Sequence, residues 1–325
     1  MTASHETPVD RPGGAARARG SVTAAGSVPG RPYIDVHAHL GETINRVPPV
    51  GQSAEKYLAR MAQSGVVAAI PCPAAGGPQA RGVLDTRDEA EAIAGACRRY
   101  PRRFPLGLAN LEVRHQRAGV DELERGMAES GLLGFMVHPG ISGHQLGPVL
   151  HEALEVVAGR GGLALLHVGS GASEAAAGAL ARRFPGATFI MAHVSTTATG
   201  HRAAIEHLAG LENVWADFAQ HPSTADASWD IPHLVRHFDE GRLLFGSDAP
   251  YYDYRLLQAQ IEGAGLPERV KDAIAHGNAT GLIRRFRPRW EPDLGPVGDP
   301  QGPLLGPFAE VDLWRTQPGQ PARLV

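Results

Sequence analysis

The chain has 325 residues and a formal net charge of -3, from 31 Lys and Arg against 34 Asp and Glu. Positive and negative charges are therefore nearly equal in number, and the protein has no large field of one sign that would attract nucleic acid or an anionic membrane. We expect a small-molecule partner instead. Hydrophobic residues make up 43% of the chain and charged residues 20%, as in proteins that bury a large core.

Cysteine usage and apolar runs indicate the compartment. Cys72 and Cys97 lack a Cys-x-x-Cys partner, which argues against a disulfide framework and a zinc knuckle. The N-terminal segment lacks the apolar core of a secretory signal, and no apolar run is long enough to cross a bilayer. We therefore expect a cytoplasmic protein without a membrane partner; a homodimer is one candidate for its oligomeric state.

Composition divides the chain into three parts. Residues 1–30 are rich in Ala, Gly, Arg and Ser without apolar periodicity, which predicts a disordered extension. Residues 31–287 carry the pattern of a single folded domain. In 288–325, recurring Pro and Gly exclude long helices and central strands, which predicts a C-terminal tail. The residues through which this tail would pack on the domain are Trp290, Leu304, Phe308 and Trp314.

Eight short apolar runs alternate with helix-like stretches along the domain. The runs are bounded by Gly or Pro, which is typical of buried parallel strands. The stretches between them often begin at Ser, Thr or Asp and end in Arg or Gly, as helix capping favours. Eight such units predict an α/β fold, a (β/α)8 TIM barrel, over an open doubly wound sheet. The runs lie at 33–37, 66–71, 104–109, 133–138, 163–168, 188–193, 213–218 and 242–247.

Metal-binding residue types recur where these runs end, which is where such barrels perform chemistry. His37 and His39 lie two positions apart on one strand, so they face the same side and can share a cation. Neutral imidazole suits Zn, Fe, Ni or Cu, and a carboxylate would complete a catalytic site. The expected ligands of one divalent metal ion are His37, His39, His167 and Asp248.

Two other interpretations of these residues compete with a metal site. Any single histidine among the 15 in the chain is more simply explained as a hydrogen-bonded core or surface residue. The ordered set at strand ends, which also includes His138 and His193, favours the metal. Gly-rich stretches at 159–162 and 169–171 lack the spacing of a nucleotide-binding loop.

The motifs IDVHAHLG, LLHVGS, MAHVS, LLFGSDAP and HGNATGLI together resemble the amidohydrolase superfamily over residues 33–286. The resemblance is to its amidohydrolase-related branch, which includes decarboxylases similar to aminocarboxymuconate semialdehyde decarboxylase. It implies that Asp248 binds the metal or its water and acts as general base. It also implies that His193 lies beside the metal and polarises the substrate or transfers a proton.

One departure from the family pattern concerns the number of metals. Many members carry a strand 4 lysine whose carbamate bridges two metals, and Met136 occupies that position here. We therefore expect one ion, with Zn2+ as first choice and Mn2+ or Fe2+ as alternatives. His138 either contacts metal or substrate, or only caps the strand end.

Several other residues are candidates for substrate binding. Glu42 follows the His-x-His strand, His221 follows the seventh run, and tyrosines follow Asp248. Each also has a simpler explanation as a solvated or packing residue. Two loop arginines would pair with a substrate carboxylate. Besides His138, the candidates are Glu42, His221, Tyr251, Tyr252 and Tyr254, with Arg46 and Arg81 as the arginines.

Three functions fit these residues. The first is a metal-dependent hydrolase that cleaves a small-molecule amide, ester or lactone through metal-activated water. The second is a non-oxidative decarboxylase, a lyase, of a small carboxylic acid on the same metal site. The third is a catalytically silent barrel that serves as a binding protein, because fold alone does not prove activity.

Overall fold

The computed structural model describes residues 30–43, 50–74, 80–139, 147–222 and 226–292. Most of the predicted extension at 1–30 and of the predicted tail at 288–325 lies outside these ranges. So do Arg46, Leu304, Phe308 and Trp314. The boundaries of the predicted domain therefore stay predictions. Arg31, its first residue, pairs with Glu262, and Trp290, beyond its predicted end, is buried against the described fold.

Eight parallel strands occupy the eight predicted runs, which confirms the predicted strand order. The first strand is longer than its run because it continues into a hairpin with the short antiparallel strand β2, Val50–Gln52. The last strand is shorter than predicted. The parallel strands are β1 (Tyr33–Thr43), β3 (Val66–Pro73), β4 (Leu108–Asn110), β5 (Gly134–Val137), β6 (Leu163–His167), β7 (Thr188–Ala192), β8 (Val214–Asp217) and β9 (Leu243–Leu244).

Two hydrogen-bonded sheets, β2-β1-β3 and β4-β5-β6-β7-β8-β9, make up the barrel. Across the first seam, the Val36 amide donates to the Phe245 carbonyl at 3.1 Å, which joins β1 to the end of β9. Across the second, the Ala69 amide donates to the Arg103 carbonyl at 2.8 Å. In the described chain no ladder joins β3 to β4 or β1 to β9, and bonds between single backbone groups bridge both seams.

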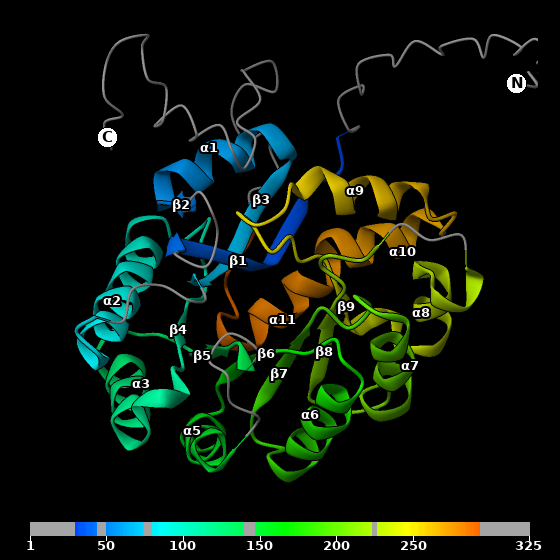
Figure 1. Cartoon of the computed structure of the whole chain (residues 1–325). Helices are drawn as coiled ribbons and strands as arrows, with labels where there is room; N and C mark the ends of the chain where they lie inside the picture. The colour runs from blue at the N-terminus through cyan, green and yellow to red at the C-terminus, as the bar shows by residue number, and fades with distance from the viewer. Residues whose placement is uncertain (1–29, 44–49, 75–79, 140–146, 223–225, 293–325) are drawn as a thin grey trace, which may run out of the picture.

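The helices surround the strands, and α11 crosses the centre of the view in Figure 1. Ser53 caps α1 where the sequence predicted a helix start, and Thr197 and Asp253 cap α7 and α9 in the same way, although no stretch was predicted to begin at these two residues. Each side chain accepts a hydrogen bond from a backbone amide of the first turn. A π-helical turn, Ala273–Gly277, joins the last two helices. The helices are α1 (Ala54–Ser64), α2 (Val83–Arg99), α3 (Arg117–Glu129), α5 (Pro148–Gly159), α6 (Ala172–Arg183), α7 (Ala198–His207), α8 (Ile231–His237), α9 (Tyr254–Gly263), α10 (Glu268–Asp272) and α11 (Asn278–Phe286).

The apolar residues form two clusters. One fills the space between the strands and the surrounding helices. The other lies inside the barrel and includes Met136, Leu165 and Ile190, with residues of α11 and Trp290. The Trp290 indole donates to the Arg102 carbonyl, just before β4, so it covers the rim where strands begin. Among the described helices, none has the length and apolarity needed to cross a membrane.

Replacing Trp290 by Ala tests whether the described start of the tail belongs to the folded unit. Trp290 is 9% exposed and packs on the barrel interior, so its loss should lower the free energy of unfolding by about 3 kcal/mol. Urea denaturation measures this, with Leu256→Ala, at a position 51% exposed, as a control expected to change stability by less than about 0.5 kcal/mol. An unchanged unfolding midpoint in Trp290→Ala would contradict this packing.

Candidate metal centre

Two histidines of β1 and the aspartate after β9 meet at the rim where the strands end. The Nε2 atoms of His37 and His39 lie 3.1 Å apart, and Asp248 Oδ1 lies 3.0 Å from His39 Nε2. The backbone fixes this approach, because the Asp248 amide donates to the His37 carbonyl at 2.8 Å. His37 and His39, two positions apart on β1, are thus brought together with Asp248, more than two hundred positions further along the chain.

His167 and His193 complete the cluster from β6 and from the residue after β7. His167 Nε2 lies 3.1 Å from His37 Nε2, and the His193 ring centroid lies 4.8 Å from that of His37. One ligand atom from each of His37, His167, His193 and Asp248 falls within 4.8 Å of the others, and all four residues are buried. His39 is not one of these four residues, but its Nε2 atom contacts His37 and Asp248. The structure therefore brings together all five residues assigned to metal or catalysis from the sequence.

Each histidine is held through its Nδ1 atom. His39 and His167 lie 2.8 and 3.0 Å from the backbone carbonyls of Pro73 and Val137. His193 lies 3.2 Å from the Ala219 carbonyl. A carbonyl oxygen can only accept, so Nδ1 carries the proton in these rings and Nε2 keeps its lone pair. This arrangement is typical of histidines that bind a metal.

Asp217, at the end of β8, is a functional residue that sequence reasoning missed. Its Oδ2 atom accepts from His37 Nδ1 at 3.1 Å, and its Oδ1 atom accepts the amides of His193 and Ala219 at 3.1 and 3.0 Å. One buried carboxylate thereby orients two histidines of the centre. A signal was present in the sequence, since Asp217 is the only charged residue in the run 213–218.

Burial and neighbouring charges set the protonation of the cluster. Burial lowers the pKa of His167 well below its ordinary value, and the neighbouring histidines lower it further. Burial alone would raise the pKa of Asp248, but its hydrogen bond to His39 and the imidazoles around it bring that pKa below its ordinary value. Burial alone would lower the pKa of His39, but Cys72 and the hydrogen bond to Asp248 raise it well above its ordinary value. An ionised Asp248 carboxylate is therefore the favoured state.

This donor set fits a divalent metal ion. Nitrogen ligands about 2.0–2.1 Å from a tetrahedral zinc ion would lie about 3.3 Å from one another, close to the Nε2 separations of 3.1 Å. The Nε2 lone pairs face the same region, and Asp248 supplies a negative charge. His37, His167 and Asp248 belong both to the predicted ligand set and to the group whose ligand atoms lie within 4.8 Å of one another. That group contains His193 where the sequence predicted His39, so the choice of His39 as the further ligand stays a prediction.

Two of the predicted substrate-binding residues lie next to the centre. The His138 ring lies 4.4 Å from the His167 ring, centroid to centroid, and burial lowers the pKa of His138 to about 4. The Tyr251 ring lies edge-on to His39 at 5.5 Å. Both residues are half-buried. Their roles toward a substrate stay predictions.

Other predicted candidates lie elsewhere. His221 is buried, and neither ring nitrogen has a hydrogen-bond partner in the described chain. Its ring packs edge-on to Phe218, and it is not one of the four residues whose ligand atoms converge. Tyr252 is half-buried, and Tyr254 is buried beside Tyr57. Arg81 pairs with Asp85 and Asp88 of α2.

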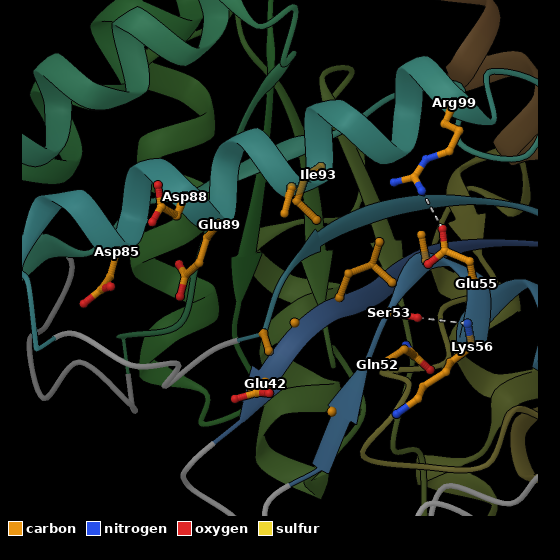
Figure 2. Close-up of a pocket in the computed structure, with 16 residues that line it drawn as sticks. Glu42, Gln52, Ser53, Glu55, Lys56, Asp85, Asp88, Glu89, Ile93 and Arg99 are labelled. Atoms are coloured by element: carbon orange, nitrogen blue, oxygen red, sulfur yellow. Dashed lines mark hydrogen bonds and ion pairs between the residues drawn. The ribbon is translucent and has the colours of Figure 1, made fainter. Parts of the chain in front are cut away.

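Glu42 lies in a separate cavity. This cavity, of about 550 Å3, lies between the β1–β2 hairpin and α2, and none of the five clustered residues lines it. Figure 2 shows Glu42 on one side and Asp85, Asp88 and Glu89 of α2 opposite. Gln52, which lines the cavity, donates its side-chain amide to the His39 carbonyl at 2.7 Å. Substrate binding by Glu42 stays a prediction.

Comparison with known proteins assigns the family. The family model described as "Amidohydrolase" matches residues 34–285, and the chain belongs to this family of enzymes. This match confirms that the chain is a member of the amidohydrolase superfamily, as the sequence predicted. It also agrees with the predicted (β/α)8 fold and with the prediction that the protein is an enzyme. No curated protein matches the sequence.

Solved structures share the fold at low sequence identity. A dihydroxybenzoic acid decarboxylase from Polaromonas, with bound manganese and the inhibitor 2-nitroresorcinol, has a TM-score of 0.62 at 16% identity, covering 79% of this chain and 98% of its own. A 5-carboxyvanillate decarboxylase from Sphingomonas paucimobilis has a TM-score of 0.58 at 16% identity, covering 78% and 99%. A probable 2-pyrone-4,6-dicarboxylic acid hydrolase from Acinetobacter baumannii has a TM-score of 0.57 at 13% identity, covering 77% and 98%.

The role of Asp217 predicts the effect of Asp217→Asn. The substitution preserves size but places an amide beside His37 Nδ1, so His37 is no longer held in the tautomer that leaves Nε2 as a ligand. Metal affinity should fall about 10- to 100-fold, measured by competition with a chelator. Asp226→Asn, at an exposed helix cap, is the control and should bind metal normally. Wild-type affinity in Asp217→Asn would contradict the assignment.

Glu89, in the separate cavity, predicts a pH dependence of stability. Burial raises its pKa from 4.5 to about 7, and neighbouring Asp85 and Glu112 add to this. The folded state then binds a proton more tightly than the unfolded state, so stability is lost as pH rises from about 4.5 to about 7.

Glu89→Gln should therefore be more stable than wild type by roughly 1–3 kcal/mol at pH 8, with no such advantage at pH 4. Urea denaturation at both pH values measures the difference, with Glu206→Gln, whose side chain is 73% exposed, as control. An equal difference at both pH values would show that charge is not the cause.

Proposed function

We propose that the protein is a metal-dependent hydrolase that cleaves an amide, ester or lactone bond of a small molecule, with Zn2+ as the ion. The observation that carries the proposal is the state of Asp248. Its carboxylate is buried among imidazoles that lower its pKa, so it is ionised and able to accept a proton inside the centre. Three imidazoles and one carboxylate suit zinc, although manganese and iron accept similar ligands.

The residues around the centre divide the chemistry. A divalent cation, when bound, polarises a carbonyl group and lowers the pKa of water. Asp248 accepts the proton of the attacking water and can return it to the leaving group. His193, whose Nδ1 donates to the Ala219 carbonyl, presents the Nε2 lone pair, which accepts a proton and then, as imidazolium, donates a hydrogen bond to the substrate oxygen. His138 and Tyr251 border the same space and would orient the substrate.

The second candidate is decarboxylation, which the names of two structural neighbours favour. In that reaction the bond between a carboxylate and its carbon breaks, carbon dioxide leaves, and a proton replaces it on carbon. His193 Nε2, which keeps its lone pair because Nδ1 donates to the Ala219 carbonyl, can take this proton from solvent and deliver it to the carbon. These two structures are 16% identical to this chain, and likeness at that level shows a shared fold but not a shared reaction. Hydrolysis and decarboxylation must therefore be separated by experiment.

The test is product analysis of the metal-loaded protein on two substrate panels, one of amides, esters and lactones and one of carboxylated phenols and enol acids. We expect hydrolysis products, and Asp248→Asn should lower kcat/KM by about 10^2- to 10^4-fold while circular dichroism stays unchanged. Carbon dioxide release without hydrolysis would replace the proposal by the decarboxylase. Failure to bind zinc or manganese, with no turnover, would favour a silent barrel.

A further inference from the structure

Backbone conformation singles out one residue beside the centre to which no role has yet been given. Among the described residues, four other than glycine have a positive φ: His193 (66°), Asp248 (58°), Gln220 (61°) and Gln116 (51°). This conformation is unfavourable for such residues and persists where the surrounding structure imposes it, often at functional sites. His193 and Asp248 belong to the centre. Gln220 is the third member of the same neighbourhood.

The side chain of Gln220 contacts Asp248 directly. Its Nε2 atom donates a hydrogen bond to Asp248 Oδ2. The other carboxylate oxygen, Oδ1, lies 3.0 Å from His39 Nε2 and 3.4 Å from His37 Nε2. The two oxygens of Asp248 therefore have different partners, with the imidazole ligands on one side and the amide of Gln220 on the other.

The chain before Gln220 is held on both sides. The Ala219 amide donates to Asp217 Oδ1 at 3.0 Å, and the Ala219 carbonyl accepts from His193 Nδ1. These bonds fix the path of the backbone just after β8. The positive φ of Gln220 then turns its side chain toward Asp248, where it is half-buried.

We propose that Gln220 is a positioning residue that makes Asp248 bind the metal through one oxygen only. A carboxylate can offer one or both oxygens to a cation. By holding Oδ2, the amide of Gln220 restrains rotation of the carboxylate and leaves Oδ1 to the ion. This inference rests on the proposed function, because it takes Asp248 as a metal ligand.

The experiment uses variants that keep the backbone conformation accessible. Gln220→Gly removes the side chain and relieves the positive φ, and Gln220→Asn keeps an amide that is one carbon too short to reach Asp248. The matched control is Gln116→Gly, which makes the same change at the other positive-φ glutamine, before α3. Each protein is loaded with Co2+, and its affinity, visible absorption spectrum and thermal unfolding are measured.

We expect both Gln220 variants to bind Co2+ at least about 10-fold more weakly and to show a shifted absorption band, because the carboxylate can now rotate. Thermal stability of the metal-free protein should not fall in Gln220→Gly. Gln116→Gly should match wild type in affinity and spectrum. Wild-type affinity and spectrum in both Gln220 variants would overturn the inference alone, since the metal site itself would be intact. Failure of the wild-type protein to bind Co2+ would overturn the proposed function as well.

Discussion

The hydrogen bonds between β1 and the segment after β9 are the constraint on which the centre depends. The Asp248 amide donates to the His37 carbonyl, and the His39 amide donates to the Ala249 carbonyl at 2.7 Å. Asp35 reinforces this seam, because its Oδ1 atom accepts the amides of both His37 and Ser247. Without this seam the carboxylate would not face the two imidazoles, and a barrel with the same strands would have no centre.

Buried charge is tolerated here because every carboxylate near the centre is hydrogen-bonded. Asp217 accepts from one imidazole and two amides, and Asp35 accepts from two amides and from the hydroxyls of Tyr57 and Ser247. Burying an ionised group without such partners costs several kcal/mol. The same bonds restrict the movement of the ligands, so the network that makes burial possible also organises the site in advance of binding.

The residues that stabilise the barrel and the residues assigned to chemistry lie at opposite ends of its strands. Trp290 and α11 cover the rim where strands begin, and the clustered histidines lie at the rim where strands end. Substitutions in the loops after the strands can therefore change the substrate without disturbing the core. This arrangement explains how one fold occurs in proteins with the names of a decarboxylase and of a hydrolase.

The sequence by itself determined the order of strands and the end of each strand at which His37, His39, His167 and Asp248 lie, because short apolar runs and the alternation of a strand are local properties. Only the tertiary structure decided which side chains hold these ligands. The hydrogen bond from His37 to Asp217 spans 180 positions, and that from Gln220 to Asp248 depends on a backbone turn after β8. The same reason applies to Glu42, in the part of β1 that pairs with β2, and to His221, beyond the end of β8: packing sets the direction of these side chains, and no local pattern records it.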